Sequence, residues 1–478
     1  MTIYEKYGLF IDGKWTAGSE EIEVRSPTTE RKLGVSSAAS RKDTRTAIDA
    51  AERALSPLRK MGGFARADAM HRIADLIQAH AEEAARIISA ETGKPLAQSR
   101  REWGLACDQF RWYAEEARRI YGRTVESRVP GGKYEIAKEP VGIVGAFTAW
   151  NFPAVLAARK IAPAMAAGCP VILRPSSQTP GSVMILADCI RAAELPRGSV
   201  GLVVGKTDET YGPLMADARV RKVSLTGSTR VGQKMLRDAA QTVKKVSMEL
   251  GGNAPFIIYE DADLELALDM AVPAKFANCG QVCVSPDRFF IHESRHDAFV
   301  EGFVDRASRI TLGDGLYETT MMGPLISSSR LEEIDGVVRE AVFDGASIAF
   351  GGKRAAGFNE GHFYEPTVLT DVKDEMRVFA EENFGPVAAI SPFREEDEVI
   401  SRANATEMGL AAYAFTKSPT CAGRAISALK SGMVGINTCA IAASEAPFGG
   451  TGFSGLGREG GPEGIEGHLE TKLAHIAF

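Results

Sequence analysis

The 478 residues are 45% hydrophobic, 25% charged and 8% aromatic, which is typical of a soluble globular chain of two or three domains. Fifty-six basic and 62 acidic residues leave a net charge of −6, so the charge balance gives no reason to expect nucleic-acid binding. No stretch approaches the ~20 apolar residues of a membrane span, the start lacks an apolar signal core, and seven cysteines do not imply a disulfide framework. We therefore expect a cytoplasmic protein with free thiols and no membrane partner.

The first third of the chain predicts a β-hairpin, a long helical region and a second hairpin. Asp12-Gly13 is a turn dipeptide between two short apolar runs, which favours a hairpin over residues 9–15. Apolar residues recur at three- and four-residue steps between 43 and 119, the period of amphipathic helices. Pro130-Gly131-Gly132 separates two alternating segments and predicts the second hairpin.

The middle of the chain alternates four times between short apolar runs and helical stretches. The expected strands are 141–147, 170–173, 201–204 and 222–225. The expected helices are 155–167, 182–193, 209–216 and 232–240. This alternation predicts an open parallel sheet with helices on its faces, and ligands of such sheets bind at the carboxyl ends of the strands.

A second alternating region extends from about 254 to 436. Strands are expected at 289–291 and 346–350, and a helix is expected at 328–344. The tail is rich in glycine from Pro447 onward and ends in an expected strand at 469–477. The fold class is therefore α/β, with two α/β halves joined by a hairpin.

Cys283 is the candidate nucleophile, because small and polar residues flank it and let the backbone approach closely. The alternative is a small buried hydrophobe, the commoner role of a lone cysteine. Cys279 lies four residues earlier, but no second Cys or His pair has zinc spacing, so no metal is expected. A thiol needs a base, and the seven histidines lack motif context. Glu249 follows an apolar run and precedes Gly251-Gly252, which favours a carboxylate at a strand end over a surface glutamate.

Two further segments follow predicted strands. Thr226 to Gly232 is a glycine-containing turn before a helix, where backbone N–H groups bind phosphate, although its spacing departs from the dinucleotide fingerprint. Asn151 offers a side-chain amide that could stabilise an oxyanion, and its alternative role is to cap a helix.

Together these segments resemble the NAD(P)-dependent aldehyde dehydrogenase family over essentially the whole chain. Six motifs occur in that family's order. They are Trp150–Pro153, Thr226–Ser228, Glu249–Gly252, Gly280–Cys283, Glu382–Val387 and Pro447–Gly450.

The resemblance implies oxidation of an aldehyde to an acid through a cysteine thiohemiacetal and thioester. Cys283 matches the nucleophile and Glu249 matches the general base for thiol activation and deacylation. Asn151 matches the side-chain half of the oxyanion hole, and the Cys283 backbone N–H is the other half. The presence of all three residues argues against a non-catalytic binding paralogue. Glu249 also argues against a CoA-acylating relative.

The resemblance also implies a nicotinamide cofactor. Gly227 and Ser228 match residues near the pyrophosphate, Glu382 matches the carboxylate that holds the nicotinamide ribose, and Phe384 packs nearby. Further residues assigned to this site are Trp150, Ser176, Gly232 and Leu250. Many NAD-preferring members have Lys and Glu where this chain has Arg174 and Ser177. A guanidinium without that carboxylate favours a 2′-phosphate, so we expect NADP+ to be preferred, with NAD+ tolerated. The alternative is that Arg174 only replaces lysine as a ribose ligand.

For the substrate, the nearest resemblance is to the succinate-semialdehyde dehydrogenase branch. Arg159 matches an arginine that binds the distal carboxylate there, but a second arginine of that branch is replaced by Ala277. Lactaldehyde and glycolaldehyde dehydrogenases share the Arg159-Lys160 pair, so a small hydroxyaldehyde or a general aliphatic aldehyde is the alternative. Residues expected to line the aldehyde site are Phe152, Leu156, Arg159, Ser444 and Phe448.

By the same resemblance the fold is an aldehyde dehydrogenase fold in three parts. The cofactor domain is expected at 1–124 and 142–250, and the catalytic domain at 251–446. Residues 125–141 and 447–478 are expected to form a small β oligomerisation arm, because exposed strand edges need a partner. We therefore expect a homotetramer or a homodimer.

Overall fold

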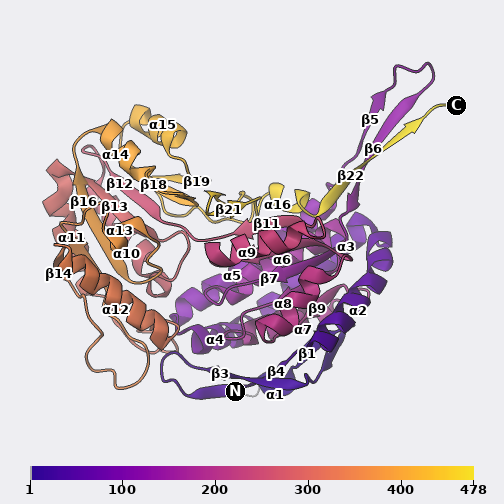
Figure 1. The fold of residues 1–478 in the computed structure, drawn as a ribbon, viewed down its shortest axis with the longest axis horizontal. Coiled ribbons are helices and arrows are strands. Elements are labelled where there is room, and N and C mark those ends of the chain that lie inside the picture. The colour runs from indigo at the N-terminus through magenta and orange to yellow at the C-terminus, as the bar shows by residue number, and fades with distance from the viewer. Residues whose placement is uncertain (1–2) are drawn as a thin grey trace.

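The computed structural model describes residues 3–478, and Figure 1 shows two sheet-based halves with a β arm that projects from one of them. The first sheet has eight strands in the order β2-β1-β9-β8-β7-β10-β11-β21. Its parallel strands are β7 (Ile143–Phe147), β8 (Val171–Arg174), β9 (Val200–Leu202), β10 (Val220–Thr226) and β11 (Lys245–Glu249). Antiparallel neighbours are β1 (Leu9–Ile11), β2 (Lys14–Thr16) and β21 (Gly455–Leu456). The predicted first hairpin and all four predicted strands are confirmed.

Helices cover both faces of this sheet because its strands are apolar on both faces. Val144 and Ala146 of β7 pack in one core, and Ile143 and Phe147 pack in the other. One layer holds α3 (Gly62–Ala79), α4 (Ala81–Thr92), α5 (Leu96–Ala117), α6 (Pro153–Ala167) and α7 (Gly181–Ala192). The opposite layer holds α2 (Arg41–Lys60), α8 (Thr207–Ala216) and α9 (Thr229–Ala240). These helices confirm the long helical region and the four helices expected between the strands.

The second sheet has seven strands in the order β14-β15-β16-β13-β12-β18-β19, parallel except for the edge strand β14. Its strands are β12 (Ala254–Ile258), β13 (Pro286–His292), β14 (Ser347–Phe350), β15 (Thr367–Thr370), β16 (Val387–Phe393), β18 (Ala411–Phe415) and β19 (Met433–Ile436). Its helices are α10 (Leu264–Phe276), α11 (His296–Ser308), α12 (Ser328–Phe343), α13 (Arg377–Ala380), α14 (Glu396–Ala403) and α15 (Pro419–Ala428). The strands predicted at 289–291 and 346–350 and the helix at 328–344 are confirmed.

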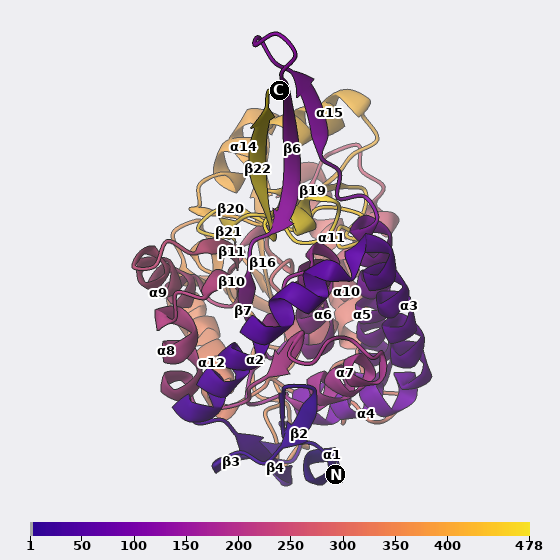
Figure 2. The ribbon, with the colours of Figure 1, turned by 90° about the vertical axis from the view of Figure 1, so that its right-hand side faces the viewer.

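The arm is a three-stranded antiparallel sheet in the order β22-β6-β5. Its strands are β5 (Arg123–Glu126), β6 (Lys133–Pro140) and β22 (Leu469–Ile476), so the predicted hairpin and terminal strand are confirmed. The expectation that this hairpin joins the two halves is wrong, because the chain passes from the first sheet to the second between β11 and β12. Residues 133–140 pair with 469–476 along the full length of both strands. Figures 1 and 2 show the arm standing away from the two halves.

The remaining elements are short and peripheral to the two sheets. They are α1 (Ile3–Lys6), β3 (Glu20–Arg25), β4 (Lys32–Ala38), β17 (Met408–Gly409), β20 (Thr451–Gly452) and α16 (Glu463–Glu466). No helix in residues 3–478 is both long enough and apolar enough to cross a membrane.

Candidate active site

Close backbone contacts bring three of the six motifs together between the two sheets. A Cβ added to Gly252 would lie 2.3 Å from the Cys283 carbonyl oxygen. A Cβ added to Gly280 would lie 2.0 Å from the Gly385 carbonyl oxygen. Both distances are too short for any side chain, so glycine at these positions allows the segments around Glu249, Cys283 and Glu382 to meet.

The turn that precedes Cys283 has an unusual backbone. Asn278 and Cys279 adopt left-handed conformations, with φ of 48° and 58°. Such conformations are costly for residues other than glycine, and the surrounding structure must hold them. Gln281 does so, because its Nε2 donates to the Asn278 carbonyl at 2.9 Å and its Oε1 accepts from the Ile326 N–H at 2.9 Å. The sequence pattern indicates Gln281 only as a polar residue that flanks Cys283, whereas its side chain is fully buried and fixes the turn.

Asn151 lies at the turn between β7 and α6, against the Cys283 loop. Its Nδ2 donates to the Gln281 carbonyl at 3.1 Å, and its own carbonyl accepts from the Asn278 side chain at 3.1 Å. Phe152 is the N-cap of α6 and no side chain caps that helix, so the capping alternative for Asn151 is wrong. The Asn151 amide therefore has one N–H to offer beside the cysteine.

Glu249 ends β11 and is only 3% exposed, as expected of a strand-end carboxylate. Neither of its carboxylate oxygens has a hydrogen-bond partner in residues 3–478. Burial, and then the nearby Glu459 carboxylate, raise the pKa of Glu249 well above its usual value, while Lys160 and Arg159 oppose the rise. A buried carboxylate with both oxygens free is suited to accept a proton.

The Cys283 thiol shares this electrostatic environment. Burial, followed by the Glu382 and Glu249 carboxylates, raises the pKa of Cys283 to about 12, and Arg159 opposes the rise. The thiol is therefore neutral near pH 7 and requires a base. The groups that shift the Cys283 pKa include two carboxylates, Glu382 and Glu249, and no histidine is named among them.

Arg159 projects from α6 and is only 7% exposed. In residues 3–478 its guanidinium makes no hydrogen bond and no ion pair, and its Nε is a buried donor without an acceptor. It lies over the Phe448 ring, 4.2 Å from the ring centroid. The adjacent Lys160, by contrast, is paired with Glu459 at 2.6 Å. A buried cation without a partner is costly unless a ligand supplies the anion.

Two buried polar pairs near these residues were missed by sequence reasoning. Lys94 Nζ donates to Glu102 at 2.5 Å and to the Asn151 carbonyl at 2.6 Å, and Glu102 in turn accepts from the Ala154 N–H at 2.8 Å. Gln109 donates from Nε2 to Ser444 Oγ at 2.8 Å. No sequence signal marked them, because charged and amide residues in a helical region usually face solvent.

The turn between β10 and α9 has the form expected of a phosphate site. Ser228 is the N-cap of α9, no side chain caps the helix, and the Thr226 hydroxyl is buried without a partner. The Gly227 N–H is engaged by the Glu249 carbonyl at 3.0 Å, so it is not available to a ligand. A Cβ at Gly232 would lie 2.6 Å from the Leu250 side chain, so Gly232 serves close packing of α9.

Arg174 ends β8 and is half-buried; in the segment that follows, Ser176 is buried and Ser177 is half-buried. Arg174 Nη2 donates to the Gly205 carbonyl at 3.2 Å, and its Nε is buried without an acceptor. Burial lowers the pKa of Arg174. The guanidinium therefore retains donors for a further acceptor.

On the nicotinamide side, Trp150 and Phe384 meet edge to face at 5.7 Å between ring centroids. Glu382 accepts a hydrogen bond from the Gly252 N–H at 2.9 Å. Burial raises the pKa of Glu382 to about 7, with that hydrogen bond opposing the rise. Free donors at the α9 turn, a free guanidinium donor and the half-buried Glu382 carboxylate together fit a dinucleotide.

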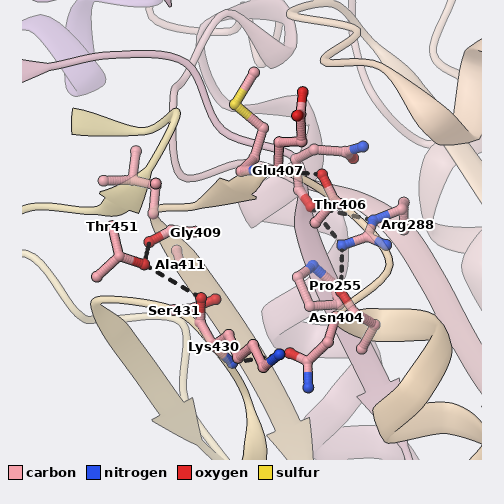
Figure 3. Close-up of a pocket in the computed structure, with 15 residues that line it drawn as sticks. Pro255, Arg288, Asn404, Thr406, Glu407, Gly409, Ala411, Lys430, Ser431 and Thr451 are labelled. Atoms are coloured by element: carbon pink, nitrogen blue, oxygen red, sulfur yellow. Dashed lines mark hydrogen bonds between the residues drawn. The ribbon is translucent and has the colours of Figure 1, made fainter.

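Figure 3 shows a separate cavity of about 190 Å³ beside β17 and β18. Arg288 lines it and donates to the carbonyls of Asn253, Arg402 and Ala403. No residue assigned above to catalysis, to the cofactor or to the aldehyde lines this cavity. The cavity is therefore not the candidate site.

The aldehyde dehydrogenase family model matches residues 15–474. The chain belongs to the aldehyde dehydrogenase family. The predicted family and fold are confirmed, and the protein is an oxidoreductase that converts aldehydes to acids with NAD(P)+.

Relatives of this aldehyde dehydrogenase are similar over nearly their whole length. A non-phosphorylating aspartate-semialdehyde dehydrogenase of Halomonas elongata is 44% identical over 99% of this chain and 96% of that protein. The NADP+-dependent succinate-semialdehyde dehydrogenase of Escherichia coli K12 is 40% identical over 98% of this chain and 97% of that protein. The crystal structure of succinate-semialdehyde dehydrogenase from Burkholderia pseudomallei is 40% identical, covers 99% and 98% of the two chains, and superposes with a TM-score of 0.97.

Proposed function

We propose that this aldehyde dehydrogenase oxidises a short semialdehyde with a distal anionic group, such as succinate semialdehyde, and prefers NADP+ to NAD+. The observation that carries the proposal is Arg159, a buried guanidinium with no acid partner in residues 3–478. A substrate carboxylate would supply that partner. The relatives named above act on substrates of this class.

The proposed chemistry follows from the three residues around the nucleophile. Glu249 takes the proton of Cys283, and the sulfur attacks the aldehyde carbon to form a thiohemiacetal. Asn151 Nδ2 and the Cys283 N–H donate to the oxygen that becomes negatively charged in this step. A bound NAD(P)+ supplies the hydride acceptor. The thiohemiacetal becomes a thioester when its carbon loses the hydride, and Glu249 releases the thiol proton to solvent. The free Glu249 carboxylate then takes a proton from the water that attacks the thioester carbon. The C–S bond breaks, the proton passes from Glu249 to the Cys283 sulfur, and the acid leaves.

The proposed cofactor site uses the α9 turn for the pyrophosphate and Glu382 for the nicotinamide ribose. Arg174, with Ser176 and Ser177 beside it, would face the adenosine ribose. Ser177 brings no negative charge, and Arg174 Nε lacks an acceptor, which supports a 2′-phosphate at this position. The remaining assignments are Trp150, Gly227, Ser228, Gly232, Leu250 and Phe384 for the cofactor, and Phe152, Leu156, Ser444 and Phe448 for the aldehyde.

A second candidate function is oxidation of a small neutral hydroxyaldehyde such as lactaldehyde or glycolaldehyde. Ala277 favours it, because the second arginine of the succinate-semialdehyde branch would occupy that position. Single-point recognition of a carboxylate is weaker than recognition by two guanidinium groups. Arg159 would then meet a substrate hydroxyl instead.

We also retain the three-part division of the chain and the oligomeric arm as proposals. The cofactor domain would comprise 1–124 and 142–250, the catalytic domain 251–446, and the arm 125–141 and 447–478. Leu473 and Val125 are exposed apolar side chains on the arm, which supports a contact with another copy, in a dimer or tetramer. All seven cysteines are free, which supports a reducing, cytoplasmic location.

Initial rates with each cofactor against five aldehydes test the proposal. The aldehydes are succinate semialdehyde, glutarate semialdehyde, lactaldehyde, glycolaldehyde and propanal. A dominant semialdehyde rate with NADP+ is expected. Faster oxidation of the neutral aldehydes would favour the second candidate and leave the roles of Cys283, Glu249 and Asn151 unchanged.

A further inference from the structure

A buried amide lies near Arg159 and has no role in the chemistry above. Gln109, on α5, is only 1% exposed. Its Nε2 donates to Ser444 Oγ at 2.8 Å. Its Oε1 is buried and accepts no hydrogen bond from residues 3–478. A buried carbonyl oxygen without a donor is a cost that folded proteins rarely carry.

Contacts on both sides of Gln109 place it next to the proposed anion site. Gln109 and Tyr113 are four residues apart on α5 and so lie on one face of that helix. Tyr113 is near enough to Arg159 for the guanidinium to oppose the rise in the Tyr113 pKa that burial causes. On the other side, the Ser444 carbonyl accepts from the Gly461 N–H at 2.8 Å. Phe448 pairs with Glu459, two residues before Gly461, so Ser444 and Phe448 lie along the same segment. The Phe448 ring lies over the Arg159 guanidinium. Gln109 and Ser444 therefore border the place where the distal end of the substrate would sit.

We propose that Gln109 Oε1 accepts a hydrogen bond from a donor on the substrate carbon that bears the acid group. The preferred substrate is then a semialdehyde with an ammonium or a hydroxyl group beside its carboxylate. This inference rests on the proposed function, because Arg159 must hold the acid for Gln109 to reach its neighbour.

Gln109 Oε1 can accept a hydrogen bond but cannot donate one, and this difference would make the site selective among substrates. A carbonyl oxygen can only accept, so the partner must carry an N–H or an O–H. A substrate without a donor leaves Oε1 unpaired in a dry site, and sites of this kind reject the analogue that lacks the group. Unsubstituted succinate semialdehyde is such an analogue, so we expect it to be a substrate, through Arg159, but a poorer one than an acid that carries the donor.

Three four-carbon semialdehydes, which differ only in the substituent beside the carboxylate, test the inference on the wild-type enzyme. They are 4-oxobutanoate (succinate semialdehyde), 2-amino-4-oxobutanoate and 2-hydroxy-4-oxobutanoate, with butanal as the uncharged reference. We expect kcat/KM with NADP+ to be about 10- to 100-fold higher for at least one of the two substituted acids than for 4-oxobutanoate. Comparison of kcat/KM for the amino and the hydroxy compound identifies which donor the site binds.

Two variants show whether Gln109 is responsible. Gln109→Leu has a similar volume without the acceptor, and we expect it to bring the substituted-to-unsubstituted ratio to within about threefold of one. Ser444→Ala is the matched control, because it removes the same hydrogen bond to Ser444 but keeps Gln109 Oε1, so the ratio should persist. Thermal melting of each variant establishes that it is folded.

The outcomes separate the two proposals. If wild-type enzyme oxidises 4-oxobutanoate as well as or better than both substituted acids, or if Gln109→Leu keeps the ratio, the role of Gln109 is wrong. The proposed function still stands in that case provided that the acids exceed butanal. If butanal matches all three acids, the proposed function itself fails.

Discussion

Arg159 and Lys160 are neighbours on α6, yet only Lys160 has an acid partner in residues 3–478. Lys160 Nζ lies 2.6 Å from Glu459 Oε1, whereas the Arg159 guanidinium lies over the Phe448 ring and has no hydrogen bond or ion pair within residues 3–478. Both side chains are buried. Lys160 therefore has its counter-ion within the protein, whereas the proposed function gives Arg159 a substrate anion as its partner.

Removal of the base should slow acid formation strongly and remove its dependence on pH. Because burial and Glu459 raise the pKa of Glu249, the active deprotonated form appears only as pH rises above the ordinary glutamate range. We expect kcat/KM of the wild-type enzyme to increase with pH as Glu249 loses its proton, which gives the pH–rate profile a rising limb. Glu249→Gln should lower kcat by about 10²- to 10⁴-fold and remove the limb. A pH–rate profile of this variant that keeps the wild-type shape would assign the base elsewhere.

The buried Lys94–Glu102 pair should position the Asn151 backbone. Lys94→Met leaves Glu102 charged and buried, so it should destabilise the fold by about 3–5 kcal/mol in denaturant titration. Adding Glu102→Leu removes the unpaired charge and should recover most of that stability. The double variant still lacks the hydrogen bond from Lys94 to the Asn151 carbonyl, so its kcat should stay low while KM changes little. A double variant with wild-type kcat would show that the pair serves stability alone.

A single negative charge should reverse the cofactor preference. Ser177→Glu places a carboxylate beside the expected 2′-phosphate, and repulsion should lower kcat/KM for NADP+ relative to NAD+ by at least about tenfold. Gln178→Glu adds the same charge at the exposed neighbouring position and should change the ratio much less. Equal effects of the two substitutions would mean that Ser177 does not face the ribose.

The arm should hold copies of the chain together. Leu473 is 62% exposed on β22, and an aspartate at this position would make burial of the arm in a contact between copies costly. Leu473→Asp should therefore give a smaller species in light scattering than the wild-type chain. Deletion of the residues after Glu470 should do the same. Unchanged mass in both cases would place the contact on another surface.

The sequence predicted the first sheet well and the second sheet only in part. Strands of the first sheet are separated by helices with a clear period, so each apolar run is recognisable. In the second half, runs such as Val387–Phe393 and Ala411–Phe415 are rich in alanine, and their length and composition do not distinguish buried strands from buried helix segments. Only the pairing with β13 and β12 establishes them as strands.

For the site, residues within short motifs were predictable and residues that act across the chain were not. Glu249 ends β11 and Asn151 lies in the turn after β7, and local patterns indicate both strands. Gln109 and Ser444, in contrast, are 335 residues apart, and nothing in either local segment predicts their hydrogen bond. The Lys94 contact with Asn151 is likewise a product of how α5 and α6 pack, which a single sequence does not show.

The most direct test of the central claim is kcat/KM with NADP+ for succinate semialdehyde and for butanal, measured on wild-type enzyme and on Arg159→Met. The two substrates share a four-carbon chain and differ in the distal carboxylate. We expect the wild type to prefer the acid, and Arg159→Met to lose about 10- to 100-fold on the acid while its butanal rate and its melting temperature are maintained. Equal losses on both substrates, or a wild type that prefers butanal, would contradict the assignment of Arg159 to a substrate anion.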